Sequence, residues 1–278
     1  MKGLPGHPAF PLEIRVTGAS TNELLDFAHQ LADAAAEVQR RWFRAELEIE
    51  SKLDESPVTI ADRETELLMR EMIQARFPDH GIFGEEYGKQ AVDAEYVWVL
   101  DPIDGTKSFI CGRPQFGTLI GLVRQGQPLL GIIDQSILRE RWVGVQGEPA
   151  TFNGKPIRTR ACADLSAAVL ASYSRRMFPK GPQRDAFDAL EERVYLSQFN
   201  TDCYGYGLLA AGFVDLVVEQ DLFPYDYLPI LPILAGAGAT VTDWKGRPVG
   251  MGSPGRVIVA GDARVHAQAL AMFQSLPD

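Results

Sequence analysis

The chain contains the stretch Trp98-Val99-Leu100-Asp101-Pro102-Ile103-Asp104-Gly105-Thr106, in which an apolar run meets two carboxylates. The run before Asp101 predicts a strand. Pro102 fixes its own φ angle, so a tight turn there directs both carboxylates and the Ile103 carbonyl oxygen toward one point, a ligand set that suits a hard cation such as Mg²⁺. Gly105 and Thr106 then offer backbone N–H groups, at a predicted helix start, to a phosphate oxygen. The alternative is a strand-ending turn in which Asp101 only caps a helix.

Other acids flank this stretch along the sequence. Glu85 and Glu86 follow a short apolar run upstream, Asp62 lies in the first turn of a predicted helix, and Glu219 and Asp226 flank an apolar, aromatic stretch downstream. Each acid also has a plainer explanation. The paired glutamates suit a solvated loop, and Asp62 would compensate a helix dipole. Asp226, among apolar neighbours, needs a partner to offset its desolvation, and a helix cap would serve as well as a cation.

The spacing of apolar residues predicts the other elements. Steps of three and four residues favour helices at 20–43 and 61–77, with Ser20 and Glu23 as a capping box of the first and Thr59 as the cap of the second. Short β-like runs at 96–100, 117–123, 129–134 and 141–145 have short connections, which favour antiparallel neighbours. Further strands are expected at 168–172, 216–219, 239–243 and 257–260, and helices at 185–192 and 227–237. These elements predict two sheets with helices between and around them.

The composition indicates a globular chain with an acidic balance. The 278 residues include 27 Lys and Arg against 37 Asp and Glu, which gives a net charge of −10. This negative charge disfavours binding to the phosphate backbone of nucleic acids. The 46% share of hydrophobic residues excludes intrinsic disorder of the whole chain. Three widely spaced cysteines indicate neither a disulfide framework nor a zinc site. Residues 1–16 hold no apolar run long enough for a secretory signal, and no run is long enough to span a membrane, so we expect a cytoplasmic protein.

Together the acidic motifs resemble the lithium-sensitive, Mg²⁺-dependent phosphomonoesterase superfamily, whose best-known member is inositol monophosphatase. That superfamily combines a distal Asp, a Glu-Glu pair, Asp-Pro-Ile-Asp-Gly-Thr and a C-terminal Trp-Asp-x-x-Ala-Gly. The similar residues here occur in the same order over nearly the whole chain and are Asp62, Glu85-Glu86, Asp101 to Thr106 and Tyr225-Asp226. Tyr225 stands for the usual Trp, and Leu228-Pro229 replace the small residues after Asp226.

Further stretches resemble the histidinol-phosphate phosphatase branch more than the inositol branch. They are Asp104-Gly105-Thr106-Lys107-Ser108-Phe109-Ile110, Phe116-Gly117-Thr118-Leu119-Ile120, Gly131-Ile132-Ile133-Asp134-Gln135 and Glu140-Arg141-Trp142-Val143-Gly144. The resemblance implies hydrolysis of L-histidinol phosphate to L-histidinol and phosphate in histidine biosynthesis. Alternative substrates are inositol phosphate, another sugar phosphate or a nucleotide 3′-phosphate. A protein-binding accessory factor is the non-enzymatic alternative.

The resemblance also implies a fold and an assembly. The fold is a layered αβαβα sandwich, with an N-terminal subdomain at residues 19–150 that carries most metal ligands and a C-terminal subdomain at 151–278 that closes the active site. The implied assembly is a homodimer, with a small phosphate monoester as substrate and neither nucleic acid nor membrane as a partner.

The roles of the site residues follow from the same resemblance. Two or three Mg²⁺ ions are implied, with Glu85, Asp101 and the Ile103 carbonyl as ligands of one, Asp101, Asp104 and Asp226 as ligands of a second, and Glu85 as a contact of a third. Asp62 and Thr106 position the attacking water, and the N–H groups of Gly105 and Thr106 hold phosphate oxygens. Asp202 and Glu219 are the candidates for the cationic end of the substrate, since Glu219 precedes Asp226 at the family's spacing. A loop cap is the alternative for Asp202.

Overall fold

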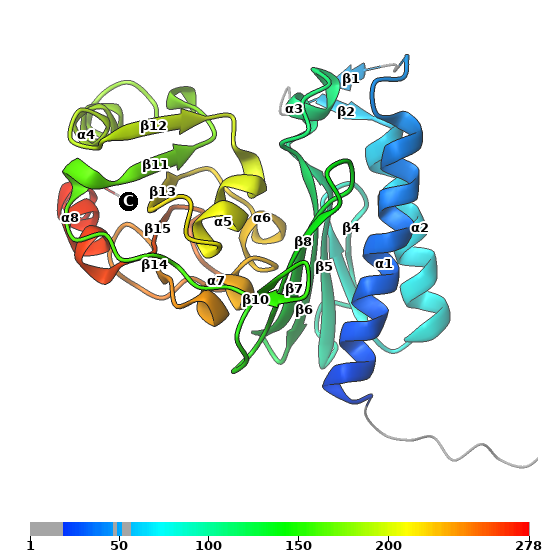
Figure 1. Cartoon of the computed structure of the whole chain (residues 1–278). Coiled ribbons are helices and arrows are strands. Elements are labelled where there is room, and N and C mark those ends of the chain that lie inside the picture. The colour runs from blue at the N-terminus through cyan, green and yellow to red at the C-terminus, as the bar shows by residue number, and fades with distance from the viewer. Residues whose placement is uncertain (1–18, 47–48, 52–56, 278) are drawn as a thin grey trace, which may run out of the picture.

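The chain folds into five layers in which helices alternate with sheets (Figure 1). The computed structural model describes residues 19–46, 49–51 and 57–277. The αβαβα sandwich that the sequence implies is confirmed. The expectation for residues 1–16 lies outside the described residues. Within those residues, no helix combines the length and the apolar character needed to cross a membrane.

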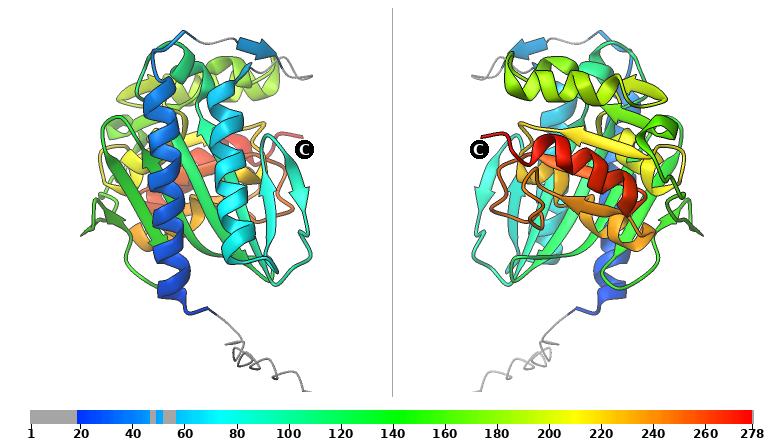
Figure 2. Two further views of the ribbon diagram at one scale, coloured as in Figure 1. Left: turned by 90° about the vertical axis from the view of Figure 1, so that its right-hand side faces the viewer. Right: turned by 90° about the vertical axis from the view of Figure 1, so that its left-hand side faces the viewer.

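Two long helices, α1 (Thr21–Trp42) and α2 (Ile60–Arg76), form the first layer and cover one face of the larger sheet (Figure 2). Ser20 caps α1 as predicted, because its side chain accepts a hydrogen bond from Glu23 N at 3.2 Å. The Glu23 carboxylate pairs with Arg76 of α2 instead of completing the predicted capping box. Thr59 caps α2, also as predicted, and forms a full capping box with Asp62.

The larger sheet has eight strands within the described residues, in the order β10-β9-β8-β7-β6-β5-β3-β4. They are β3 (Gly81–Gly84), β4 (Gly88–Gln90), β5 (Tyr96–Asp104), β6 (Gly117–Arg124), β7 (Gln127–Gln135), β8 (Glu140–Val145), β9 (Thr151–Phe152) and β10 (Lys155–Pro156). The strands from β5 to β8 are antiparallel, as their short connections predict, and β3 runs parallel to β5. A separate pair, β1 (Ile49–Ser51) and β2 (Pro57–Thr59), precedes α2.

The strand β5 extends further than the sequence predicts. We expected a turn at Pro102, but the strand continues to Asp104 with an irregular register after Asp101. Pro102 lies at the irregularity because it has no N–H to donate across the sheet. Its carbonyl oxygen accepts hydrogen bonds from Gln39 Nε2 at 2.8 Å and Thr118 Oγ1 at 3.1 Å. The two carboxylates therefore sit on an anchored strand end.

The remaining layers are built from the second half of the chain. The middle layer contains α5 (Asp202–Ala210), α6 (Pro224–Tyr227) and α7 (Leu231–Ala237), and it lies between the two sheets (Figure 1). The smaller sheet has the order β12-β11-β13-β15-β14, with β11 (Val169–Ser172), β12 (Leu196–Phe199), β13 (Leu216–Glu219), β14 (Thr240–Thr242) and β15 (Val257–Ala260). Two helices, α4 (Pro182–Glu191) and α8 (Ala263–Phe273), cover its outer face. The strands β9 and β10 belong to the larger sheet although they follow residue 150. The subdomain boundary expected at residue 150 stays a prediction.

Several elements of the second half differ from the expectation. The helix expected at 227–237 begins only at Leu231, and Pro229 lies in the break between α6 and α7, because proline cannot donate the helical hydrogen bond. The strand β12 and the helices α5 and α8 were not predicted. The sequence of α5 hides its helix because Gly205 and Gly207 have low helix propensity and the helix is buried on nearly all sides.

Candidate active site

Two carboxylates at the end of β5 meet a third from the other half of the chain. Asp101 and Asp104 belong to β5, and Asp226 lies in the first turn of α6. One oxygen atom from each of the three lies within 4.8 Å of the others, a spacing that can hold a metal ion. These residues line a cavity of about 300 Å³, together with Glu85 and Ile103.

Burial and mutual repulsion dominate the electrostatics of these carboxylates. Burial, followed by the charges of Glu85 and Asp104, raises the pKa of Asp101 well above its ordinary value. Burial also raises the pKa of Asp104 to about 7 and that of Asp226 well above its ordinary value. Asp101 Oδ1 is buried without a hydrogen-bond partner among the described residues. Buried acids that repel one another, one with an unsatisfied oxygen, fit a hard divalent cation such as Mg²⁺.

A hydroxyl and a buried carboxylate form a pair beside these acids. Thr106 begins α3 (Thr106–Ile110), and its Oγ1 lies 3.2 Å from Asp62 Oδ1 as a hydrogen-bond donor. The other oxygen of Asp62 accepts hydrogen bonds from Thr59 N at 2.8 Å and Thr59 Oγ1 at 2.6 Å. Burial raises the pKa of Asp62, and the bonds from Thr59 oppose that shift. Asp62 therefore completes the capping box of α2 with one oxygen and accepts the hydrogen bond of Thr106 with the other.

The turn after β5 packs against the start of α5. Gly105 has a φ of 90°, in the left-handed region, and a Cβ atom there would lie 2.8 Å from Cγ of Asp202. Asp202 Oδ2 accepts a hydrogen bond from Ser108 Oγ at 2.6 Å. The next residue, Cys203, donates its backbone N–H to Asp104. The two halves of the chain are therefore joined directly at the carboxylate cluster.

The two acids expected at the substrate both line the cavity, but each already has a partner in the protein. Asp202 is buried, and burial raises its pKa to about 6 despite the bond from Ser108. Glu219 is also buried and accepts hydrogen bonds from the Tyr206 hydroxyl at 2.7 Å and from Tyr173 N at 2.6 Å. Burial raises the pKa of Glu219 to about 8. The alternative of a loop cap for Asp202 does not hold, because Asp202 is the first residue of α5.

The structure brings the residues selected from the sequence to one place. Those that line the cavity are Glu85, Asp101, Ile103, Asp104, Gly105, Thr106, Asp202, Glu219 and Asp226. Asp62 lies behind Thr106, its hydrogen-bond partner. The sequence did not identify Tyr173 or Asp221, which also line the cavity. Lys107, noted only as a mark of the family branch, places its Nζ 5.1 Å from the centre of the Tyr173 ring. Asp221 is exposed with a φ of 59°, and its closeness to Glu219 in the chain was its one sequence signal.

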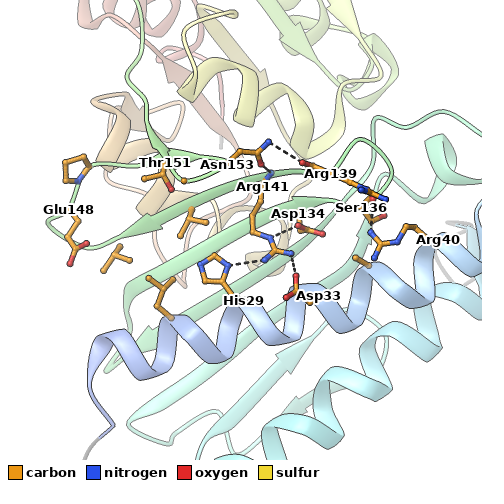
Figure 3. A pocket seen from close by; sticks show the side chains of 16 residues that line it. His29, Asp33, Arg40, Asp134, Ser136, Arg139, Arg141, Glu148, Thr151 and Asn153 are labelled. Atoms are coloured by element: carbon orange, nitrogen blue, oxygen red, sulfur yellow. Dashed lines mark hydrogen bonds and ion pairs between the residues drawn. The ribbon is translucent and has the colours of Figure 1, made fainter.

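A second cavity, of about 640 Å³, lies between α1 and the strands β7 to β9 (Figure 3). Arg141 Nε donates to Asp134 Oδ1 at 2.6 Å, and Arg141 Nη2 donates to Asp33 Oδ1 at 2.7 Å. The third guanidinium nitrogen, Nη1, lies 3.0 Å from His29 Nδ1. These groups satisfy one another, and the described part of the chain holds no cluster of three metal-ligating side chains there. The candidate active site is therefore the cavity at the end of β5.

Comparisons with known proteins agree with this geometry. Residues 20–277 match the model of the inositol monophosphatase family. The chain is 46% identical over 267 residues to the bifunctional phosphatase IMPL2, chloroplastic, of Arabidopsis thaliana, covering 92% of this chain and 77% of that protein. It is 36% identical over 224 residues to a histidinol-phosphatase of Chlorobaculum parvum, covering 80% and 86%. A solved structure of an inositol monophosphatase from Zymomonas mobilis matches with a TM-score of 0.83 and 46% identity, covering 92% of this chain and 100% of that one.

Proposed function

Because the chain belongs to the inositol monophosphatase family and is a phosphatase of that family, we propose that it hydrolyses L-histidinol phosphate to L-histidinol and phosphate with the help of Mg²⁺. One observation carries the proposal: Asp101, Asp104 and Asp226 meet in a cavity whose wall also includes the acids Asp202 and Glu219. The relatives whose names include histidinol-phosphatase support this substrate.

The acids of the cavity divide into ligands and substrate contacts. In the proposal, two or three Mg²⁺ ions are held by Glu85, Asp101, the Ile103 carbonyl, Asp104 and Asp226. Bound Mg²⁺ supplies charge neutralisation for the phosphate and the leaving oxygen, and lowers the pKa of a nucleophilic water. The protein holds five oxygen ligands on β5, α6 and the turn after β3. Among them, Asp101 Oδ1 is buried and has no hydrogen-bond partner among the described residues, so it is available to an ion.

Thr106 and Asp62 orient the nucleophile in this proposal. The Thr106 hydroxyl donates its hydrogen toward Asp62 Oδ1, so its oxygen keeps lone pairs that accept a hydrogen bond from the attacking water. As the water attacks, it gives a proton to Thr106 Oγ1 while Thr106 gives its own proton to Asp62, and burial, which raises the pKa of Asp62, makes it a better acceptor than an ordinary carboxylate. The N–H groups of Gly105 and Thr106 hold phosphate oxygens, which fixes the direction of attack.

The remaining acids favour a phosphate ester whose alcohol part carries positive charge. After the ligands are assigned, Asp202, Glu219 and Asp221 still line the cavity. Histidinol carries an ammonium group and an imidazole, both of which donate hydrogen bonds that carboxylates accept. Inositol carries hydroxyl groups only. An inositol phosphate is the second candidate, because the similar Zymomonas mobilis structure is of an inositol monophosphatase.

A phosphate-release assay tests the proposal. The panel contains L-histidinol phosphate, inositol 1-phosphate, fructose 1,6-bisphosphate and 3′-phosphoadenosine 5′-phosphate, each with the same Mg²⁺ concentration. We expect kcat/KM for L-histidinol phosphate to exceed the others by at least ~10²-fold, since hydrogen bonds from a cationic donor to a carboxylate are stronger than those from a neutral donor. Comparable values across the panel would refute the substrate. A homodimer and a cytoplasmic location remain predictions, which light scattering and cell fractionation would test.

A further inference from the structure

A buried carboxylate outside the cavity holds the turn that carries Glu85. The turn joins β3 to β4 and reads Gly84-Glu85-Glu86-Tyr87-Gly88. Glu66, on α2, is fully buried and lies against this turn. Its Oε2 accepts a hydrogen bond from Glu86 N at 2.6 Å, and its Oε1 accepts one from Tyr87 N at 3.1 Å. One side chain therefore satisfies two successive N–H groups of the turn, directly after Glu85.

Arg70 completes this anchor from the next turn of the same helix. Its Nε donates to Glu66 Oε1 at 2.7 Å, and the side chains of the pair are 8% and 0% exposed. Its Nη2 donates to the carbonyl oxygen of Gly88 at the far end of the turn. Burying an acid is costly unless its charge and lone pairs are satisfied, and here the arginine and the two N–H groups satisfy them. Glu66 and Arg70 together therefore fix both ends of the segment from Glu86 to Gly88.

The chain before Glu85 is shaped to admit this carboxylate. A Cβ atom on Gly84 would lie 2.0 Å from Glu66 Oε1, so only a residue without a side chain leaves room for Glu66 at this place. On its other side, Glu85 N donates to the carbonyl oxygen of Leu100 at 3.1 Å, next to Asp101. Glu85 thus sits between an anchor on α2 and the strand that carries the central carboxylates.

We propose that Glu66 is a positioning residue that sets the β3–β4 turn so that Glu85 can serve as a metal ligand beside Asp101. When both are ionised, as metal ligation requires, the carboxylates of Glu85 and Asp101 repel one another, and this repulsion opposes their close approach. The anchor on α2 opposes it, so the ligand set is preorganised before an ion binds. The inference rests on the proposed Mg²⁺ site, but it does not depend on which phosphate ester is the substrate.

The test is the variant E66Q, measured by calorimetric titration of the substrate-free protein with Mg²⁺. Gln keeps the size of the side chain, but its NH₂ group replaces one acceptor, so either Glu86 N or Tyr87 N loses its partner. Substitution of a residue that orients a metal ligand typically lowers metal affinity by ~10- to 100-fold, and we expect E66Q to weaken Mg²⁺ binding by that factor. The kcat at saturating Mg²⁺ should remain within about threefold of wild type. Unchanged Mg²⁺ affinity in folded E66Q would overturn the proposal.

The matched control is D215N, in the smaller-sheet half of the chain. Asp215 is also a buried acid that pairs with an arginine, Arg160, and accepts a backbone N–H, from Val169 at 2.7 Å. Its loss should lower the melting temperature as E66Q does, because each leaves a buried donor unpaired. Mg²⁺ affinity should not change in D215N. If D215N weakens Mg²⁺ binding as much as E66Q, the effect is one of general stability and the positioning role is wrong.

A double-mutant cycle with Glu85 tests whether Glu66 affects Mg²⁺ binding through Glu85. In the E85Q background the ligand that Glu66 positions has lost its charge, so adding E66Q should weaken Mg²⁺ binding by less than about threefold. Equal weakening in both backgrounds would overturn the proposal. If E66Q does not fold, R70K replaces it and the same criteria apply. Lysine keeps the positive charge but lacks the guanidinium group that reaches both Glu66 and the Gly88 carbonyl oxygen. Should L-histidinol phosphate not be hydrolysed while E66Q still weakens Mg²⁺ binding, the substrate is wrong and the role of Glu66 stands.

Discussion

The backbone N–H of Cys203 donates a hydrogen bond to Asp104 Oδ2, so the start of α5 is fastened to the end of β5 at the carboxylate cluster. Asp104 thus has two functions, as a hydrogen-bond acceptor between the two halves of the chain and as a proposed metal ligand. An asparagine at this position keeps an acceptor oxygen for Cys203 and loses the charge. The two functions can therefore be separated.

Asp104→Asn should fold normally and lose most of its activity. We expect kcat at saturating Mg²⁺ to fall by at least ~10²-fold, the scale of losing one main electrostatic element of an active site. Steady-state kinetics and a melting curve check this. Removing divalent ions from wild type should abolish turnover, and Mg²⁺ should restore it where zinc does not. Near-normal turnover of Asp104→Asn would refute the ligand assignment.

The hydroxyl of Thr106 should affect the chemical step rather than binding. Thr106→Val removes the group that donates to Asp62, and kcat should fall by ~10²- to 10⁴-fold, the range of general acid–base groups. KM and Mg²⁺ affinity should change little. Thr106→Ser, the matched control, keeps the hydroxyl and should retain most of the activity. Similar rates for the Val and Ser variants would exclude the proposed role.

The stability of the metal-free protein tests whether Asp101 is a metal ligand or a purely structural acid. One oxygen of its buried carboxylate has no hydrogen-bond partner within the part of the chain that the structure describes, and the charges of Glu85 and Asp104 disfavour its ionised form. Metal-free Asp101→Asn should therefore melt no lower than metal-free wild type, and its melting temperature should rise less when Mg²⁺ is added, by linkage. If Asp101 only shapes the turn, the variant melts lower than wild type with and without metal.

The stability of the metal-free protein should depend on pH in a definite direction. The pKa of Asp104 is about 7 in the folded protein against an ordinary value of 3.8, so the folded state binds more protons than the unfolded state between these values. The contribution of Asp104 to the free energy of unfolding must then fall as pH rises from about 4 to about 7. Melting curves in a chelator should show this fall, with a shallower slope for Asp104→Asn. Equal slopes for wild type and Asp104→Asn over this interval would contradict the raised pKa.

Sequence reasoning succeeded where the chemistry is local. Asp101, Ile103 and Asp104 are close in the chain, so their shared direction could be expected before the fold was known. Asp226 is far away in sequence, and only the resemblance to a family connected it with β5. The anchor from Glu66 to the turn after Glu85 had no sequence signal at all, because a helix and a hairpin that meet in space share no spacing in the chain.

The elements that were missed have a common cause. The helix α5 contains Gly205 and Gly207, whose low propensity hides a helix that is held by burial between two sheets. Pro102 suggested a turn, yet the hydrogen bonds to its carbonyl from Gln39 and Thr118 keep the strand continuous to Asp104. In each case contacts from distant segments outweigh the local preference, and a single sequence does not reveal those contacts.

Glu219 should distinguish a cationic substrate from a neutral one. Its carboxyl group lines the cavity and accepts hydrogen bonds from the Tyr206 hydroxyl and from Tyr173 N, so it is held in place beside the substrate, where a cationic group favours its ionised form. Losing a charged hydrogen-bond partner costs ~1.5–3 kcal/mol, so Glu219→Gln should raise KM for L-histidinol phosphate by roughly ten- to a hundredfold, and Asp202→Asn should act alike. Hydrolysis of p-nitrophenyl phosphate, which lacks both cationic groups, should change little.

Tyr206→Phe is the control for Glu219→Gln, because it removes a hydrogen-bond donor to Glu219 and leaves the carboxyl group in place. It should affect both substrates equally. If Glu219→Gln also slows both substrates by one factor, Glu219 supports the fold or the metal site and does not recognise the substrate.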